Sequence, residues 1–244
     1  MPGPITAALL SAWERGQAEP QSVTRALALL AVASDMTPVS GAELSIGERD
    51  ALLLRLREEL FGSHVSALAV CPGCDENVEL AFDVSELSTG APRETNTALT
   101  VSWKQYKVEI RLPNSRDLLV LSEPEKLKEK RLRLLKRIVL RAESSGRPIA
   151  AQELPEELIS AIEEKILAAD PRAEVTLKLR CQSCAQEWSA LFDIGSFLWK
   201  EVDAWAVRLL REVHLLARAY GWREADILAM SPWRRHAYLE MLST

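Results

Sequence analysis

Four cysteines are the residues of this sequence whose type and spacing best suit a chemical role. They form two C-x-x-C pairs, Cys71 with Cys74 and Cys181 with Cys184. Each C-x-x-C turn can present two thiolates to one ion, and four thiolates satisfy the tetrahedral coordination of zinc. Because protein ligands would then fill every position, the site would hold the fold together and leave no place for a catalytic water. The spacing therefore predicts one structural zinc ion per chain.

The cysteine pairs lie inside a longer repeat. An aspartate follows the second cysteine of each pair by nine positions, as Asp83 in Phe-Asp-Val and Asp193 in Phe-Asp-Ile. Stretches of extended character flank both pairs, and alternation is strongest just before the second pair. These stretches cover residues 65–70, 77–82, 174–180 and 186–192. The repeat predicts two β-hairpins, each with a metal-binding turn, that face each other as a zinc ribbon.

The residue after each pair departs from a common pattern. Many such turns carry glycine there, because a positive φ lets backbone donors approach the sulfur atoms. Here Asp75 and Ala185 occupy these positions. Asp adopts a positive φ more readily than Ala does, so we expect the second turn to be the looser one.

Other chemistries use paired cysteines. A disulfide within each pair would close a very short, strained loop. A thioredoxin-like redox centre places its motif at the start of a helix, whereas both pairs here lie between predicted strands. An iron–sulfur cluster uses the same four ligands, and the sequence leaves it open.

Composition limits the class of protein. The chain has 244 residues, of which 48% are hydrophobic and 27% charged, and its formal net charge is −5. These values describe a soluble globular protein and argue against a broadly basic nucleic-acid coat. The longest uncharged apolar run, residues 26–33, is far shorter than the roughly 20 residues that span a bilayer. Because nothing at the N-terminus resembles a signal peptide, we expect a cytoplasmic protein without a membrane span.

The pattern predicts an α+β fold that is mainly helical. Ser45 and Glu48 form a capping-box pattern ahead of a helix that ends near Gly62. Alternating residues predict a hairpin over 99–112 that turns at Lys104 and Gln105. Helices are expected over 125–142 and 155–169, with a turn at 144–146 between them.

We divide the chain into five regions on these patterns. Residues 1–64 form an N-terminal helical region, and residues 65–88 form the first zinc-binding hairpin. Residues 89–172 are an inserted hairpin with helices, and residues 173–195 form the second zinc-binding hairpin. Residues 196–244 form a tryptophan-rich group of C-terminal helices.

The C-terminal region predicts a surface for partners. An amphipathic helix is expected over 196–220, followed by two short helices, the second with Ser231 as N-cap. Most aromatic side chains here should be core, but Trp and Tyr are favoured anchors of interfaces. The partner-binding candidates are Trp199, Trp205, Tyr220, Trp222 and Trp233.

No motif for catalysis, nucleotide binding or a dinucleotide cofactor occurs, so we expect neither enzymatic activity nor a small-molecule substrate. The stretch 123–147 is basic, but apolar residues interleave with its charges, which is more typical of the solvated face of an amphipathic helix. A zinc-ribbon module that binds nucleic acid through Lys126–Arg141 is the alternative function that we weigh against a purely structural one.

Several segments resemble a known family. They are Leu191–Ala206, Leu209–Ala217, Tyr220-Gly221-Trp222, Asp226-Ile227-Leu228 and Arg234–Leu239. Together with the cysteine pairs, they resemble baseplate or tail-assembly proteins of contractile-tailed phages and phage-like contractile injection systems. The resemblance runs from about Ser45 to Leu242 and is weakest over 88–171. It implies a non-enzymatic part in building or completing a baseplate, with other baseplate or tail proteins as partners. Only the four cysteines carry over residue by residue, as suspected metal ligands.

Overall fold

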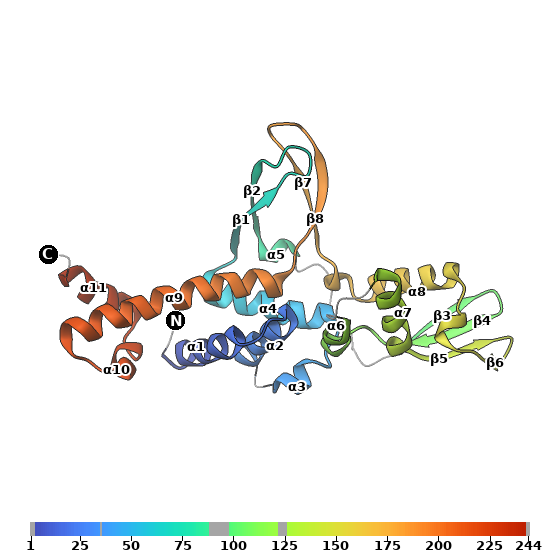
Figure 1. Ribbon diagram of the computed structural model, residues 1–244, viewed down its shortest axis with the longest axis horizontal. Coiled ribbons are helices and arrows are strands. Elements are labelled where there is room, and N and C mark those ends of the chain that lie inside the picture. Colours follow the sequence, from blue (N-terminus) through green and yellow to red (C-terminus); the bar gives the residue numbers. More distant parts are fainter. Residues whose placement is uncertain (1–2, 35, 88–97, 122–125, 243–244) are drawn as a thin grey trace. The chain divides into compact units, whose positions relative to one another are not determined.

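A computed structural model describes residues 3–34, 36–87, 98–121 and 126–242 of the chain (Figure 1). The fold is α+β and mainly helical, with small antiparallel sheets, as the sequence predicts. Two compact units make up the chain: Met1–Pro38 together with Ile194–Thr244, and Val39–Asp193. Within the part of the chain that the structure describes, no helix combines the length and apolar character that crossing a bilayer requires.

The first unit is built around one long helix. Its elements are α1 (Gly3–Gln17), α2 (Ser22–Ala33), α9 (Ile194–Tyr220), α10 (Glu224–Leu228) and α11 (Pro232–Leu242). Helix α9 contacts all four other helices of the unit (Figure 1). Its apolar residues recur every three or four positions, so Leu198, Val202, Leu209 and Leu216 are fully or almost fully buried on one face.

Helices α1 and α9 approach closely where a glycine faces a tryptophan. A Cβ atom at Gly16 would lie 2.3 Å from the Trp199 ring, so only glycine leaves room for that ring. The Arg25 guanidinium lies 5.1 Å from the centre of the same ring. Nearby, Asp203 accepts hydrogen bonds from Trp13 Nε1 at 2.8 Å and from Gln17 at 2.7 Å. These contacts order the N-terminal half of α9.

Three aromatic rings close the other end of the first unit. Tyr220 and Trp222 stack with ring centres 4.5 Å apart, and Tyr238 of α11 lies edge-on to Trp222 at 4.8 Å. Gly221, with φ +66°, ends α9 and turns the chain toward α10. The buried Arg235 donates to Glu212 at 2.9 Å and ties α11 to α9.

The second unit carries the sheets. Its helices and 3₁₀ helices are α3 (Pro38–Gly41, which begins at the boundary), α4 (Ile46–Phe61), α5 (Val84–Leu87), α6 (Ser115–Leu121), α7 (Leu127–Ile138), η1 (Ala151–Glu153), α8 (Glu156–Ala169) and η2 (Pro171–Ala173). Its strands are β1 (His64–Val70), β2 (Asn77–Asp83), β3 (Leu99–Trp103), β4 (Tyr106–Ile110), β5 (Val139–Ser144), β6 (Arg147–Pro148), β7 (Thr176–Arg180) and β8 (Glu187–Leu191).

Helix α4 has both of its predicted ends. The Ser45 and Glu48 side chains form the capping box, and Gly62 follows the last turn with φ +89°. At the first turn, the Gly47 N–H donates to Asp170 at 2.9 Å, which links α4 to the segment before β7. Asp50 lies buried beside Arg49, which contacts it at 2.7 Å. Burial raises the pKa of Asp50 to about 6, although the Arg49 guanidinium lowers it.

Strands β3, β4, β5 and β6 form one antiparallel sheet in that order. The predicted hairpin is confirmed, with Trp103 opposite Tyr106 across a turn in which Lys104 has φ +50°. The predicted helix over 125–142 is wrong at its end, because α7 stops at Ile138 and the chain continues as β5. Pairing with β4 and burial of Ala142 in the sheet's core decide the strand there. The start of that predicted helix lies outside the described residues.

An ion cluster around the buried Asp117 joins α6 and α7 to the sheet. Asp117 is fully buried and accepts two hydrogen bonds from Arg111, at 2.7 and 2.8 Å, and one from Arg137 at 2.7 Å. Burial raises the pKa of Asp117, but the hydrogen bonds from the two guanidinium groups outweigh it and hold this pKa below its usual range. The middle of the second unit is thus fixed by charge pairing as well as by apolar packing.

Candidate metal centre

Two β-hairpins carry the cysteines. In the first, β1 pairs with β2 so that Val70 lies opposite Asn77; in the second, β7 pairs with β8 so that Arg180 lies opposite Glu187. Each hairpin ends in a C-x-x-C turn. Along each strand next to its turn, half-buried residues alternate with exposed ones, as a two-layer arrangement requires. Both predicted strand–turn–strand units are therefore present.

The two turns have the same backbone geometry. The Cys71 N–H donates to the Glu76 carbonyl at 2.9 Å, and the Cys181 N–H donates to the Gln186 carbonyl at the same distance. The residue after each second cysteine adopts a positive φ, +57° at Asp75 and +58° at Ala185. In the first turn, the Gly73 N–H also points at the Cys71 sulfur, 3.4 Å away. The conformation that glycine usually provides is thus adopted without glycine in both turns.

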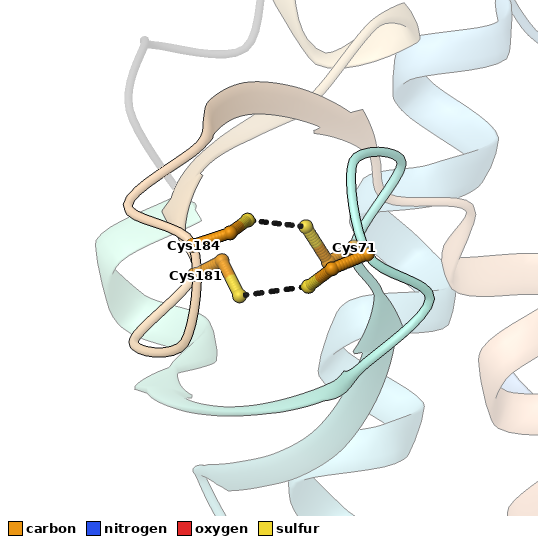
Figure 2. Close-up of side chains that lie close together, drawn as sticks. Cys71, Cys181 and Cys184 are labelled. Atoms are coloured by element: carbon orange, nitrogen blue, oxygen red, sulfur yellow. Dashed lines mark hydrogen bonds between the residues drawn. The ribbon is translucent and has the colours of Figure 1, made fainter.

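The four sulfur atoms converge on one point between the hairpins. Cys71 Sγ lies 3.6 Å from Cys184 Sγ, and Cys74 Sγ lies 3.6 Å from Cys181 Sγ, so both contacts cross from one hairpin to the other (Figure 2). All four sulfurs lie within 4.8 Å of one another. A tetrahedral zinc ion with Zn–S bonds of about 2.3 Å needs sulfurs about 3.8 Å apart. The donor set therefore fits a single tetrahedral ion.

The same distances bear on the other cysteine chemistries. All four cysteines are free thiols, and the shortest sulfur contacts join different hairpins, not the members of one C-x-x-C pair. A cluster of several irons sets its ligating sulfurs farther apart, because each thiolate binds a different iron. Neither turn opens a helix, so the redox arrangement of thioredoxin-like proteins does not form here.

Two of the thiols, Cys181 and Cys74, have shifted pKa values. Backbone N–H groups of Cys184 and Ser183 lower the pKa of Cys181 to about 6. At Cys74, the Glu76 N–H lowers the pKa, but the neighbouring sulfurs of Cys184 and Cys181 outweigh it and raise the pKa to about 12. One thiolate therefore forms readily, and further negative charge beside it is disfavoured. A divalent ion bound between the sulfurs would remove that repulsion.

Two aromatic rings also join the hairpins. Phe82 of β2 and Phe192, which follows β8, meet edge to face with ring centres 5.3 Å apart. The repeated Phe-Asp pair in the sequence was the available signal for this contact, since each phenylalanine stands eight positions after the second cysteine of its pair. The cysteine pairs and the two phenylalanines therefore belong to the same internal repeat.

The predicted partner-binding aromatics have very different exposures. Trp199 is 7% exposed, and Trp205, Tyr220 and Trp222 are half-buried against the C-terminal core cluster. Trp233 at the start of α11 is 81% exposed. Partner binding stays a prediction for all five residues, but only Trp233 presents most of its ring to solvent.

Several cations of the basic segment are engaged within the second unit. Arg131 pairs with Glu163 at 2.8 Å and also with Glu156, both on α8. Arg137 binds Asp117, and Arg141 binds Glu143 at 2.5 Å. This pairing favours the interpretation of the segment as part of the fold over a free phosphate-binding surface.

Comparison with known proteins gives one family. The family model described as T4 bacteriophage base plate protein matches residues 8–199, which include both cysteine pairs and end early in α9. No curated protein and no solved structure matches the chain.

Proposed function

Because the chain belongs to the T4 bacteriophage base plate protein family, we propose that it is a zinc-binding structural or assembly protein of a contractile tail or phage-like injection-system baseplate. Its role is to position other tail components and involves no catalysis. The observation that carries the proposal is the convergence of four cysteines, from two distant hairpins, within the residues that the family model matches.

Zinc in this site stabilises the fold. The two cysteine pairs are more than a hundred residues apart in sequence, so one ion bound to all four joins the first and second hairpins. Four protein ligands leave no open position for a substrate or water, which suits a structural ion. The site requires reduced thiols, which fits a protein that works in the cytoplasm.

The partner surface is centred on α11. Trp233 and Met241 are 81% and 65% exposed and lie eight positions apart, which is just over two helical turns. Exposed aromatic and thioether side chains are favoured anchors at protein interfaces. We assign this face of α11 to contact with another baseplate or tail protein.

The test co-expresses the full chain with baseplate proteins from the same genome and purifies it. Elemental analysis is expected to find about one zinc ion per chain, and the wild-type protein is expected to co-purify with at least one baseplate protein. Trp233→Ala should weaken this association by about tenfold or more, which corresponds to an interface anchor. The matched control is Leu127→Ala in α7, since Leu127 is 83% exposed and lies on the other unit.

Four results would count against the proposal. A metal-free chain of unchanged stability would refute the structural zinc ion. Bound iron would show that the four cysteines hold iron and not zinc. A wild-type chain that binds no baseplate protein would refute the assembly role. Tight, salt-dependent binding to DNA or RNA would favour the nucleic-acid alternative instead.

A further inference from the structure

On the outer face of α9, the cationic side chains lack ion-pair partners within the described part of the chain, while the acidic side chains of the helix are engaged. Four cations, Lys200, Arg208, Arg211 and Arg218, are exposed on this helix, and none makes an ion pair with any residue that the structure describes. The helix also has three acidic residues, and each is engaged. Asp203 accepts hydrogen bonds from Trp13 and Gln17. Glu212 accepts one from Arg235, and Glu201 also makes an interaction. The free charge of α9 is therefore entirely positive.

Apolar side chains line a groove within this cationic face. Val207, Arg211 and Leu215 lie four positions apart and form one ridge, and Leu210 and His214 form the neighbouring ridge. These five residues line an open, shallow depression with a volume of about 480 Å³. Val207 and Leu215 are 37% and 48% exposed, which is high for large apolar residues on a helix whose opposite face is fully packed. A second helix that packs its own ridge into this groove would cover them.

We propose that this outer face of α9 is the docking site for an acidic amphipathic helix of another baseplate protein. This inference rests on the proposed function, because it names the chemistry of a partner in the same assembly. Apolar residues of the partner would enter the groove beside Val207, Leu210 and Leu215. Its carboxylates would lie opposite Arg208, Arg211 and Arg218, which have no competing partner among the described residues.

Charge also argues against the other occupants. A two-fold contact between two copies of this chain would place one cationic face against another, and like charges across an interface disfavour association. Nucleic acid would use the cations but leave the apolar groove uncovered, since phosphate contacts are electrostatic. An acidic amphipathic helix is complementary to both features at once.

The test measures binding of labelled peptides to the full, zinc-loaded chain by fluorescence anisotropy. The probe is a helical peptide of about three heptads with leucine on one face and glutamate on the others. The control peptide keeps the leucines and replaces each glutamate with lysine. We expect the acidic peptide to bind and the basic peptide not to bind. Arg211→Glu should weaken binding of the acidic peptide by about tenfold, and Leu215→Ala by several-fold.

Lys107→Glu is the matched control variant. It makes the same change of net charge at an exposed position of β4 in the other unit, and we expect unchanged binding. Equal binding of both peptides, or no loss with Arg211→Glu, would overturn the proposal. Preferential binding of duplex DNA through Arg211 would assign the face to nucleic acid, and an Arg211-dependent dimer in sedimentation would assign it to a second copy; both would overturn it.

The same variant separates this inference from the proposed function. If Arg211→Glu still co-purifies with baseplate proteins as the wild type does, and the acidic peptide does not bind, the docking site is refuted and the assembly role stands. If the wild type binds the acidic peptide but no baseplate protein, the face has the proposed chemistry and the assembly role is refuted.

Discussion

The two cysteine hairpins are nearly identical at their turns but differ on their outer faces and at their bases. Both turns bury the first cysteine, expose the second, and give the next residue a φ close to +57°. Away from the turns the outer faces diverge. The first hairpin exposes Leu68 and Val70, at 66% and 59%, whereas the second carries Lys178 and Arg180 on its exposed positions. The two hairpins therefore share residues where the sulfur geometry and the contact between the hairpins require them, and their residues differ at the other positions.

The hairpins also differ at their bases. The first leaves α4 directly through Gly62, and Ser63 donates to Asp83 at 2.7 Å across its base. The second is tied to the opposite end of α4, where Asp170 accepts the Gly47 N–H. The first hairpin thus starts from the C-terminal end of α4, whereas the segment before the second hairpin is held at the N-terminal end, and the four cysteines bring the tips of both hairpins together.

Loss of one cysteine is expected to have the largest effect, and an equal effect in either hairpin. Cys71→Ser and Cys181→Ser should each abolish stoichiometric zinc, because three thiolates no longer fill the tetrahedral site. The binding free energy of a structural zinc ion, on the order of 10 kcal/mol, would then no longer stabilise the folded state. Metal content and thermal unfolding, with and without chelator, measure this. Ser189→Ala on the outer face of β8 is the control. If one of the two cysteine variants retained zinc, the two hairpins would not contribute equally to the site.

A methyl group at Gly47 is expected to disturb the second hairpin alone. The added Cβ would lie 1.9 Å from Asp170 Oδ1 and 3.0 Å from the Ala173 nitrogen, so the anchoring hydrogen bond must break. Gly47→Ala should cost about 2 kcal/mol of unfolding free energy.

Hydrogen exchange locates the effect of this change. We expect faster exchange of amides in β7 and β8 and unchanged exchange in β1 and β2. Gly73→Ala is the matched control, since its Cβ would meet nothing closer than 3.5 Å. Equal acceleration in both hairpins would show that their bases are not independent.

The ring contact between hairpins gives a smaller, pairwise effect. Phe82→Ala and Phe192→Ala should each cost about 2 kcal/mol, because both rings are half-buried. The double variant should cost less than the sum by about 1 kcal/mol, which is the coupling of an edge-to-face pair. A parallel cycle of Phe82 with Leu191, which is 67% exposed, should show no coupling. Equal coupling in both cycles would mean that the rings do not join the hairpins specifically.

Much of the metal centre could be predicted from local pattern. The C-x-x-C spacing, the Phe-Asp repeat and the alternation around them predict both hairpins, and Ser45 with Glu48 predicts the start of α4. These features depend on residues close in sequence. The Gly47–Asp170 contact joins positions more than a hundred residues apart, and nothing near either residue indicates the other.

The error at the end of α7 has the same origin. Residues 139–142 continue the apolar spacing of a helix, but pairing with β4 converts them to strand, and this pairing is a tertiary effect. The exposure of the C-terminal aromatic side chains could not be predicted from the sequence either. The helical spacing places Trp199 and Trp205 on the same stripe as buried leucines, but only packing decides that Trp233 remains in solvent.

The smallest expected effect is the one that best distinguishes the two turns. Ala185 holds a φ of +58°, which costs an alanine about 1 kcal/mol or more relative to glycine in that conformation. Glycine adds unfolded-state entropy that offsets part of this gain, so Ala185→Gly should stabilise the zinc-bound chain by about 0.5 kcal/mol net. Asp75→Gly should give no gain, because Asp tolerates the same conformation better.

Chelator competition and thermal unfolding, measured side by side for the two variants, test this asymmetry. Ala185→Asp is the matched control, since it places the residue of the first turn in the second turn and should recover part of the gain. Equal stabilisation by glycine in both turns would mean that the left-handed residue costs the same in each hairpin. The predicted looseness of the second turn would then be wrong, and the two turns would be equivalent in energy as well as in geometry.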